Sequence, residues 1–112
     1  MKKKHSFTWY HRGINEENLH LMINFKKHLL MKELKEKSIH EYMKEISNWM
    51  KFLQNKGIKT FEATIENLNE YLDRDVSESR KSRMLSVLSV FYKHNKKKNY
   101  CKENIVEKYR NK

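Results

Sequence analysis

The 112 residues suffice for one domain with a modest core, and not for two. The chain has no proline and only two glycines, which favours helices and argues against sandwiches and barrels, since these need frequent turn residues. The net charge of +11 exceeds what solubility requires, so a polyanionic partner is the leading physical explanation, and a lysine-rich proteome is the alternative.

The first 15 residues are predicted to form a basic arm before a helical domain over residues 16–110. Residues 1–12 hold four cations and no acid, and their aromatic residues follow no clean period. The arm is either flexible or folded back onto the core through these aromatics, and Gly13 separates it from the first predicted helix. The residues are Lys2, Lys3, Lys4 and Arg12, with Phe7, Trp9 and Tyr10.

A first helix is predicted from Glu16 or Glu17 to Leu34. Acids occupy its start, where the helix dipole favours them, and apolar residues recur at helical spacing. Its apolar sector is wide, so we expect it to pack on more than one neighbour. The spaced positions are Leu19, Met22, Ile23, Leu30 and Leu34, and the sector is widened by Leu21, Phe25 and Leu29.

A second helix is predicted to start at Ser38, because residues 38–41 have the S-x-x-E form of a capping box. Gly57 is expected to end it as a left-handed C-terminal cap. From the outer face alone, an ordinary solvated surface and a DNA contact are equally supported. The apolar stripe is Ile39, Tyr42, Ile46, Trp49 and Leu53, and the outer face carries His40, Lys44, Ser47, Asn48 and Lys51.

Thr64 is the predicted N-cap of a third helix, whose apolar side holds Ile65, Leu68, Tyr71 and Leu72. Residues 62–78 contain six of the 14 acids of the chain. Phosphate would repel such a side, so it should face away from any nucleic acid and make the domain electrically two-sided. The acids are Glu62, Glu66, Glu70, Asp73, Asp75 and Glu78.

A fourth helix is predicted over residues 77–93, capped by Ser77 or Ser79. One side of it is apolar, whereas the opposite side combines cations with small serines, so that a nucleic-acid backbone could approach it closely. Residues 79–102 contain no acid, although a merely solvated helix face usually mixes both signs. The apolar side is Met84, Leu85, Leu88, Phe91 and Tyr92, and the other side is Ser79, Ser82, Arg83, Ser86 and Lys93.

The remaining chain is predicted to form a loop with Lys96, Lys97 and Lys98, and then a short helix around residues 105–109. The six histidines lack metal-ligand spacing, no glycine-rich phosphate loop is present, and the carboxylates cluster on one helix side. We therefore expect no metal, no cofactor and no small-molecule ligand, and we expect core positions for Tyr42, Trp49, Phe91 and Tyr92.

Cellular location is predicted from three sequence features. The single cysteine, Cys101, excludes an internal disulfide, no apolar run is long enough for a membrane span, and no signal-peptide segment follows the opening lysines. A cytoplasmic protein without a membrane partner is expected.

Three motifs in order carry a resemblance that covers roughly residues 21–107. Residues 38–53, SIHEYMKEISNWMKFL, are similar to the T-x-x-x-Y-x-x-x-L-x-x-F-x-x-x-L pattern of the core-binding domain in tyrosine recombinases, the phage integrase family. Residues 64–72 resemble the T-x-x-D-I-x-x-Y-L helix of that domain. Residues 77–92 look like its last long helix, S-x-x-T-x-x-x-R-L-S-x-L-x-x-F-Y, at Arg83, Leu85, Ser86, Leu88, Phe91 and Tyr92.

The resemblance implies an all-α, SAM-like orthogonal bundle of four to five helices that forms half of a C-shaped clamp around double-stranded DNA. It also implies that a separate downstream domain cuts and rejoins strands through a tyrosine nucleophile, and that other integrase protomers join the synaptic complex. This chain has no room for that domain, so we expect a DNA-binding module that is not itself an enzyme. The chain departs from the family pattern at Lys35, where a serine cap is usual, and at Ile105, where a proline usually follows the asparagine.

Ten residues on the second and fourth helices are the predicted DNA contacts. Most should touch phosphates, and Lys44 and Arg83 are expected to reach base edges. Lys2 to Lys4 and Lys96 to Lys98 would add backbone contacts. Two other functions stay open: a stand-alone helix-turn-helix regulator, and a helical module that binds an acidic protein. The ten residues are Ser38, His40, Lys44, Ser47, Arg80, Lys81, Arg83, Ser86, Ser89 and Lys93.

Overall fold

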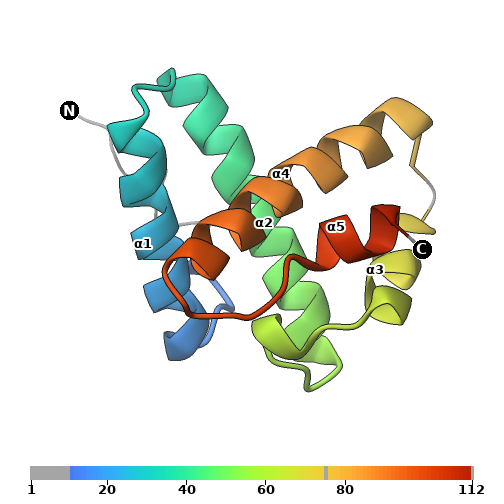
Figure 1. Cartoon of the computed structure of the whole chain (residues 1–112). Helices are drawn as coiled ribbons and strands as arrows, with labels where there is room; N and C mark the ends of the chain where they lie inside the picture. Colours follow the sequence, from blue (N-terminus) through green and yellow to red (C-terminus); the bar gives the residue numbers. More distant parts are fainter. Residues whose placement is uncertain (1–10, 75, 112) are drawn as a thin grey trace.

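The computed structural model describes residues 11–74 and 76–111, and most of the predicted basic arm, including Lys2 to Lys4, lies outside these residues. The described chain contains five α-helices and one short 3-10 helix, and no strand. Helices α1 (Glu16–Met31) and α2 (Glu36–Asn55) form an antiparallel hairpin, which α4 (Glu78–Lys97) crosses (Figure 1). The shorter helices η3 (Thr60–Glu62), α3 (Ile65–Leu72) and α5 (Ile105–Arg110) complete the predicted all-α bundle.

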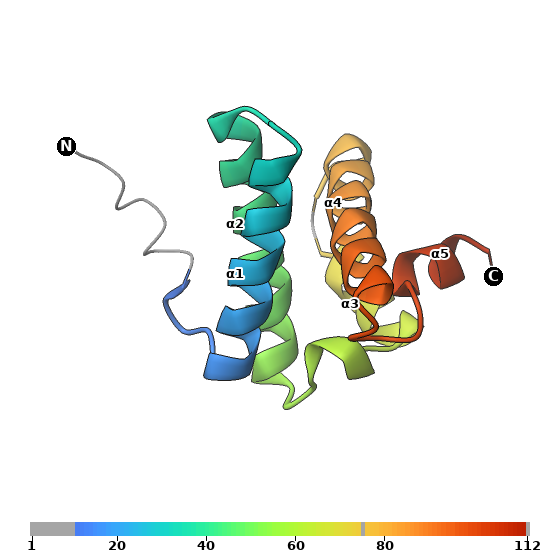
Figure 2. The ribbon, with the colours of Figure 1, turned by 60° about the vertical axis from the view of Figure 1, so that its left-hand side comes forward.

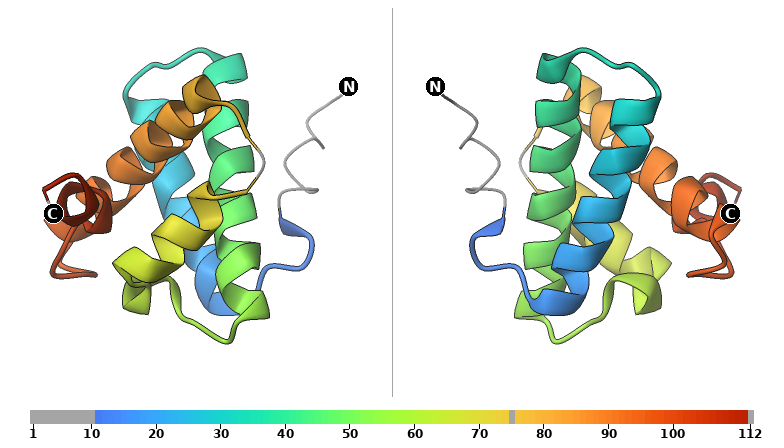
Figure 3. Two further views of the ribbon diagram at one scale, coloured as in Figure 1. Left: turned by 90° about the vertical axis from the view of Figure 1, so that its right-hand side faces the viewer. Right: turned by 90° about the vertical axis from the view of Figure 1, so that its left-hand side faces the viewer.

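The crossing of α4 sets the shape of the bundle. Figure 2 shows α1 and α2 as a pair with α4 beside them, and Figure 3 shows α4 passing obliquely over both. Helix α5 packs against α4 and α3, at the side of α4 away from the hairpin. Among the described residues, none of the helices combines the length and apolarity that a membrane crossing requires.

Helix α1 begins as predicted and ends three residues early. The side chain of Asn15 accepts a hydrogen bond from the backbone N–H of Asn18 and caps the first turn. The helix stops at Met31 because Glu33 adopts a left-handed backbone with φ of 58°. The predicted stripe is partly wrong: Met22 is buried, but Ile23 and Leu30 are 44% and 55% exposed. The buried positions are Asn18, Met22, Phe25 and Leu29.

Helix α2 begins two residues before the predicted cap. Its N-cap is Lys35, which has an extended backbone and makes no side-chain capping bond, so Ser38 already lies inside the first turn. Glu36 supplies the negative charge that the helix dipole favours there. The predicted end is confirmed, because Gly57 has a φ of 71° and its N–H donates to the carbonyl of Gln54.

The third and last helices are confirmed. Thr64 caps α3, and its side chain and that of Asn67 bond each other's backbone N–H groups in a capping box. The 3-10 turn η3 before it was not predicted. Helix α5 covers the predicted residues 105–109, and Asn104 caps it by accepting from the N–H of Val106.

Helix α4 is capped by Ser77, whose hydroxyl accepts from the N–H of Arg80. It runs one turn beyond the predicted end, so Lys96 and Lys97 are helical instead of lying in a loop. The helix ends where Asn99 takes a left-handed backbone with φ of 64°. Its buried side is close to the prediction and consists of Met84, Val87, Leu88, Phe91, Tyr92, His94 and Asn95.

The core lies where α1, α2 and α4 meet. Phe25 and Phe91 pack edge to face with 5.2 Å between ring centroids, and Trp49 packs in the same way on Tyr71 of α3 at 5.0 Å. All four side chains are fully buried. Of the four predicted core aromatics, Trp49, Phe91 and Tyr92 are buried. The fourth, Tyr42, is half-buried.

A chain of hydrogen bonds runs through this core. The indole Nε1 of Trp49 donates to the hydroxyl of Tyr92 at 2.9 Å, and that hydroxyl donates to the carbonyl oxygen of Thr60 at 2.7 Å. The Thr60 hydroxyl in turn donates to Asn18 Oδ1 at 2.7 Å. Burial raises the pKa of Tyr92, so its hydroxyl keeps the proton that it donates. These bonds tie α2, α4, η3 and α1 together and so contribute to fixing the angle at which α4 crosses.

Candidate nucleic-acid interface

A cleft of about 280 Å³ separates α2 from the first half of α4. It brings together four of the ten residues that the sequence predicted as DNA contacts, two from each helix. These four are His40 and Lys44 of α2, and Arg80 and Arg83 of α4. Glu41, Glu45 and Val87 complete the lining.

The two arginines of the cleft are held by acids that the sequence reasoning did not assign to the site. Arg83 forms an ion pair with Glu41, and Arg80 Nη2 lies 3.3 Å from Glu45 Oε1. Each pair spans from α4 to α2. The spacing of the charges could have suggested this pairing. Glu41 and Glu45 are one turn apart on α2, and the two arginines are one turn apart on α4.

The acids of the two ion pairs differ in burial, whereas Arg80 and Arg83 are 42% and 53% exposed. The Glu45 side chain is only 7% exposed and also accepts a 2.5 Å hydrogen bond from the Tyr71 hydroxyl. Burial and the adjacent Glu45 raise the pKa of Tyr71, so the phenol stays protonated as a donor. Glu41 and Arg83 are 40% and 53% exposed. The inner pair therefore anchors α2, α3 and α4, whereas the outer pair is accessible to solvent and to a ligand.

The outer side of α4 beside the cleft is exposed, as predicted. At about 100° per residue, Ser86 and Lys93 lie within roughly 80° of Arg83, on the side that faces away from the core. The described part of this side contains no acid between residues 79 and 97. We call it the α4 ridge, and it consists of Ser79, Ser82, Arg83, Ser86 and Lys93.

Four of the ten predicted contacts lie elsewhere. Ser47 is fully buried, which contradicts its assignment to an exposed face. It shares a side of α2 with Met43 and Met50, four residues before and three after it, and both are buried. Ser38 is half-buried and lies about 200° around the helix from His40.

The other two misplaced residues belong to α4. Lys81 is about 200° from Arg83 on the helix and lies 3.6 Å from Glu78. Ser89 faces α5, because its carbonyl oxygen accepts a 3.1 Å hydrogen bond from Asn104 Nδ2. The helix period alone would have separated Lys81 from Arg83, whereas Ser89 is set apart only by its contact with Asn104.

One cation that the sequence reasoning omitted extends the α2 side. Lys37 is exposed and lies two turns before Lys44 on the same side of the helix. The acids of α3 are exposed near the other end of α2. Glu70 pairs with Lys56 at 2.7 Å. Lys56 follows the end of α2, about 18 Å along the helix axis from Lys44. The predicted Asp75 lies outside the described residues.

The structure joins two histidines that are 66 positions apart in the chain. The rings of His28 and His94 lie against each other between α1 and α4, tilted by 31° and with 4.2 Å between centroids. His94 is 6% exposed, and among the described residues no hydrogen-bond partner meets its buried Nε2. Burial, then His28 and Lys98, lowers the pKa of His94 to about 4 from the usual 6.5. Burial and Lys32, Lys97 and Lys98 lower that of His28.

We expect the folded state to lose stability in mild acid through this histidine pair. Because the pKa of His94 is lower in the folded than in the unfolded chain, the unfolded chain binds more protons below pH 6.5. The resulting loss in the free energy of unfolding between pH 7 and pH 5 is about 2 kcal/mol. Urea denaturation across this range would measure it.

The matched variant is His94→Gln, which keeps a polar side chain of similar reach and cannot be protonated. Between pH 7 and pH 5 its unfolding free energy should fall by about 2 kcal/mol less than that of the parent, because it lacks the contribution of His94. The contribution of the carboxylates is common to both proteins and cancels in the comparison. Equal pH profiles for the two proteins would contradict the assignment to His94.

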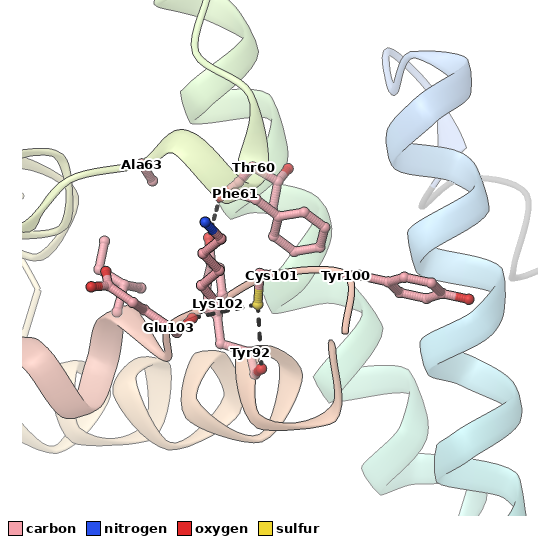
Figure 4. Close-up of a pocket in the computed structure, with 9 residues that line it drawn as sticks. Thr60, Phe61, Ala63, Tyr92, Tyr100, Cys101, Lys102 and Glu103 are labelled. Carbon is pink, nitrogen blue, oxygen red and sulfur yellow. Dashed lines mark hydrogen bonds between the residues drawn. The ribbon is translucent and has the colours of Figure 1, made fainter. Parts of the chain in front are cut away.

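A larger cleft, of about 400 Å³, lies between η3 and the loop from α4 to α5 (Figure 4). Two of its polar side chains bond to the backbone of the domain itself. The Tyr92 hydroxyl is bonded to Thr60, and the Cys101 thiol lies 3.4 Å from the carbonyl oxygen of Glu103. Burial raises the pKa of Cys101, the opposite of what a nucleophilic thiolate needs. Among the described residues, no group of three potential ligand side chains is placed to hold a metal.

The family model described as "Phage integrase, N-terminal SAM-like domain" matches residues 22–99, which include both helices of the α2–α4 cleft. No significant match was found among curated proteins or among solved structures.

Proposed function

The chain belongs to the phage integrase N-terminal SAM-like domain family, and from this premise we propose that it is the DNA-binding module of a site-specific recombinase. It would grip core-site duplex DNA with α2 and α4, while a separate domain of the recombinase cuts and rejoins the strands. The other partners in this proposal are further protomers of the same recombinase.

The observation that carries the proposal is the exposed α4 ridge beside the cations of α2. Arg83 and Lys93 project from a helix side whose other described positions are largely serine, and Lys44 lies across the cleft from Arg83. Small serines allow the helix backbone to come close to a phosphate chain, and the major groove of B-DNA is wide enough for a helix. Arg83 has the geometry to pair with guanine, and Lys93 to contact phosphate.

The charge distribution supports the same orientation. The acids of α3 lie by the C-terminal half of α2, where Glu70 pairs with Lys56, and the α2–α4 cleft lies by its N-terminal half. DNA docked on the cleft would therefore meet cations from both helices and avoid most exposed acids. Two carboxylates remain within the cleft, Glu41 and Glu45.

We expect binding to duplex DNA to fall steeply with salt. If about four cations neutralise phosphates, log Kobs should fall with log salt concentration at a slope of roughly −3 to −5, because counterions are released on binding. Affinity would then drop roughly 100-fold between 50 and 200 mM salt. Titration of the purified chain into a labelled mixed-sequence duplex at four salt concentrations measures this slope, and a flat response would refute a phosphate-dominated site.

A protein-binding role is the second candidate, and one observation favours it. Ile23, Leu30 and Met31 of α1 are 44%, 55% and 83% exposed, which is unusual for large apolar side chains that come so close together on one helix. Competition separates the two roles. Unrelated duplex DNA should displace a ligand from the α2–α4 cleft, and it should leave a protein bound to α1 in place.

A further inference from the structure

Glu41 is the more exposed of the two acids that line the α2–α4 cleft. Its carboxylate is paired with Arg83, the residue best placed on the α4 ridge to meet DNA, and lies on the same helix as Lys44. A phosphate that approaches Arg83 therefore meets a cation already paired with a carboxylate, which repels the phosphate whether or not the ion pair opens.

The inner ion pair, Arg80 with Glu45, provides a comparison, because its acid has a structural role only. Glu45 is 7% exposed and is held by both Arg80 and Tyr71, so DNA has little access to it. Glu41 is 40% exposed and is paired with Arg83. A half-exposed ion pair contributes little to stability, which makes it easy to exchange.

We propose that Glu41 is a specificity-determining residue, which holds Arg83 back from phosphates and releases it to base edges. The inference rests on the proposed function. Phosphates are the same at every position along a duplex, so an acid that opposes them weakens binding to all sequences alike. A carboxylate can, however, accept a hydrogen bond from the amino group of cytosine in the major groove. Only sequences that supply such a partner would compensate for the displaced ion pair.

The test compares Glu41→Gln with Glu70→Gln. Both variants lose one negative charge and keep the side-chain shape, and both break an ion pair between helices, but Glu70 pairs with Lys56 far from the cleft. Each protein is titrated, at several salt concentrations, into a labelled mixed-sequence duplex. A duplex of about 30 base pairs is long enough to span the proposed contacts. Each is also used to select sequences from a randomised duplex library.

For Glu41→Gln we expect roughly three- to tenfold tighter binding to the mixed-sequence duplex and a salt slope steeper by about one. The sequences that it selects should be less biased than those selected by the parent protein. Glu70→Gln should resemble the parent in both measurements. Urea denaturation of the two variants checks that they are equally folded.

The other outcomes separate the two hypotheses. Equal affinities for the Glu41 and Glu70 variants would overturn the role of Glu41 and leave DNA binding intact. Tighter binding by Glu41→Gln with unchanged selected sequences would also overturn its role in specificity. Failure of the parent protein to bind the duplex even at low salt would overturn the proposed function itself.

Discussion

The double charge reversal Lys44→Glu with Arg83→Glu should weaken binding to duplex DNA by roughly 30- to 1,000-fold, which corresponds to about 2–4 kcal/mol of binding free energy. The two residues lie on opposite walls of the α2–α4 cleft, so the double variant removes a cation from each helix. It also places two new carboxylates next to Glu41, and they would repel any phosphate between the helices. Titration into the mixed-sequence duplex at low salt gives the loss directly.

The control for this experiment is Lys59→Glu. Lys59 is exposed next to η3, beyond the C-terminal end of α2 and away from the cleft, and it lines a different depression with Asn15 and Gln54. Reversal there changes the net charge of the protein without touching the proposed face, so affinity should change less than about threefold. If Lys59→Glu weakened binding as much as reversal at Lys44 or Arg83, binding would reflect net charge alone and the cleft would lose its assignment.

A neutral pair of substitutions guards against misfolding. Arg83→Glu would place a second carboxylate opposite Glu41, and repulsion between the two would push α4 away from α2. The displaced helix could by itself abolish binding. Lys44→Gln combined with Arg83→Gln removes the cations without this repulsion, and we expect it to bind roughly tenfold more weakly than the parent. Unchanged affinity in this variant would remove both residues from the interface.

The helix periods predicted the fold well because they depend on local chemistry. The apolar side of α4 follows from the spacing of Met84, Leu88 and Phe91, and all three are buried. The end of α2 at Gly57 and the cap at Thr64 were predictable for the same reason, since each depends on a few neighbouring residues. The start of α2 was missed because the S-x-x-E pattern at residues 38–41 gave a stronger local signal than Lys35, the true cap.

The composition of the cleft was harder to predict because it depends on how the helices cross. Ser47 looked polar and exposed, yet the side of α2 that it shares with Met43 and Met50 is buried. The partners of Arg80 and Arg83 are 35 and 42 positions away in the chain, and only the crossing of α4 brings them together. Sequence patterns therefore found the cationic helix and missed the acids that face it.

Replacement of Trp49 by alanine should destabilise the domain by about 3–5 kcal/mol, the usual cost of deleting a fully buried indole. Trp49 is fully buried, and its ring packs on Tyr71 at 5.0 Å and on Phe52 at 5.8 Å between centroids. The substitution also leaves the Tyr92 hydroxyl without its donor. Since a domain of this size is stable by only about 5–15 kcal/mol, the melting temperature should fall by roughly 10–20 °C.

The milder variant Tyr92→Phe separates packing from hydrogen bonding. It keeps the ring and removes only the hydroxyl that accepts from Trp49 Nε1 and donates to Thr60, so we expect a loss of about 1–2 kcal/mol in the free energy of unfolding. If the bonds from Trp49 through Tyr92 to Thr60 help to set the crossing angle of α4, this variant should remain folded and bind the mixed-sequence duplex more weakly. Unchanged DNA affinity in a folded Tyr92→Phe protein would show that packing alone positions the α4 ridge, and that the hydrogen bonds contribute only to stability.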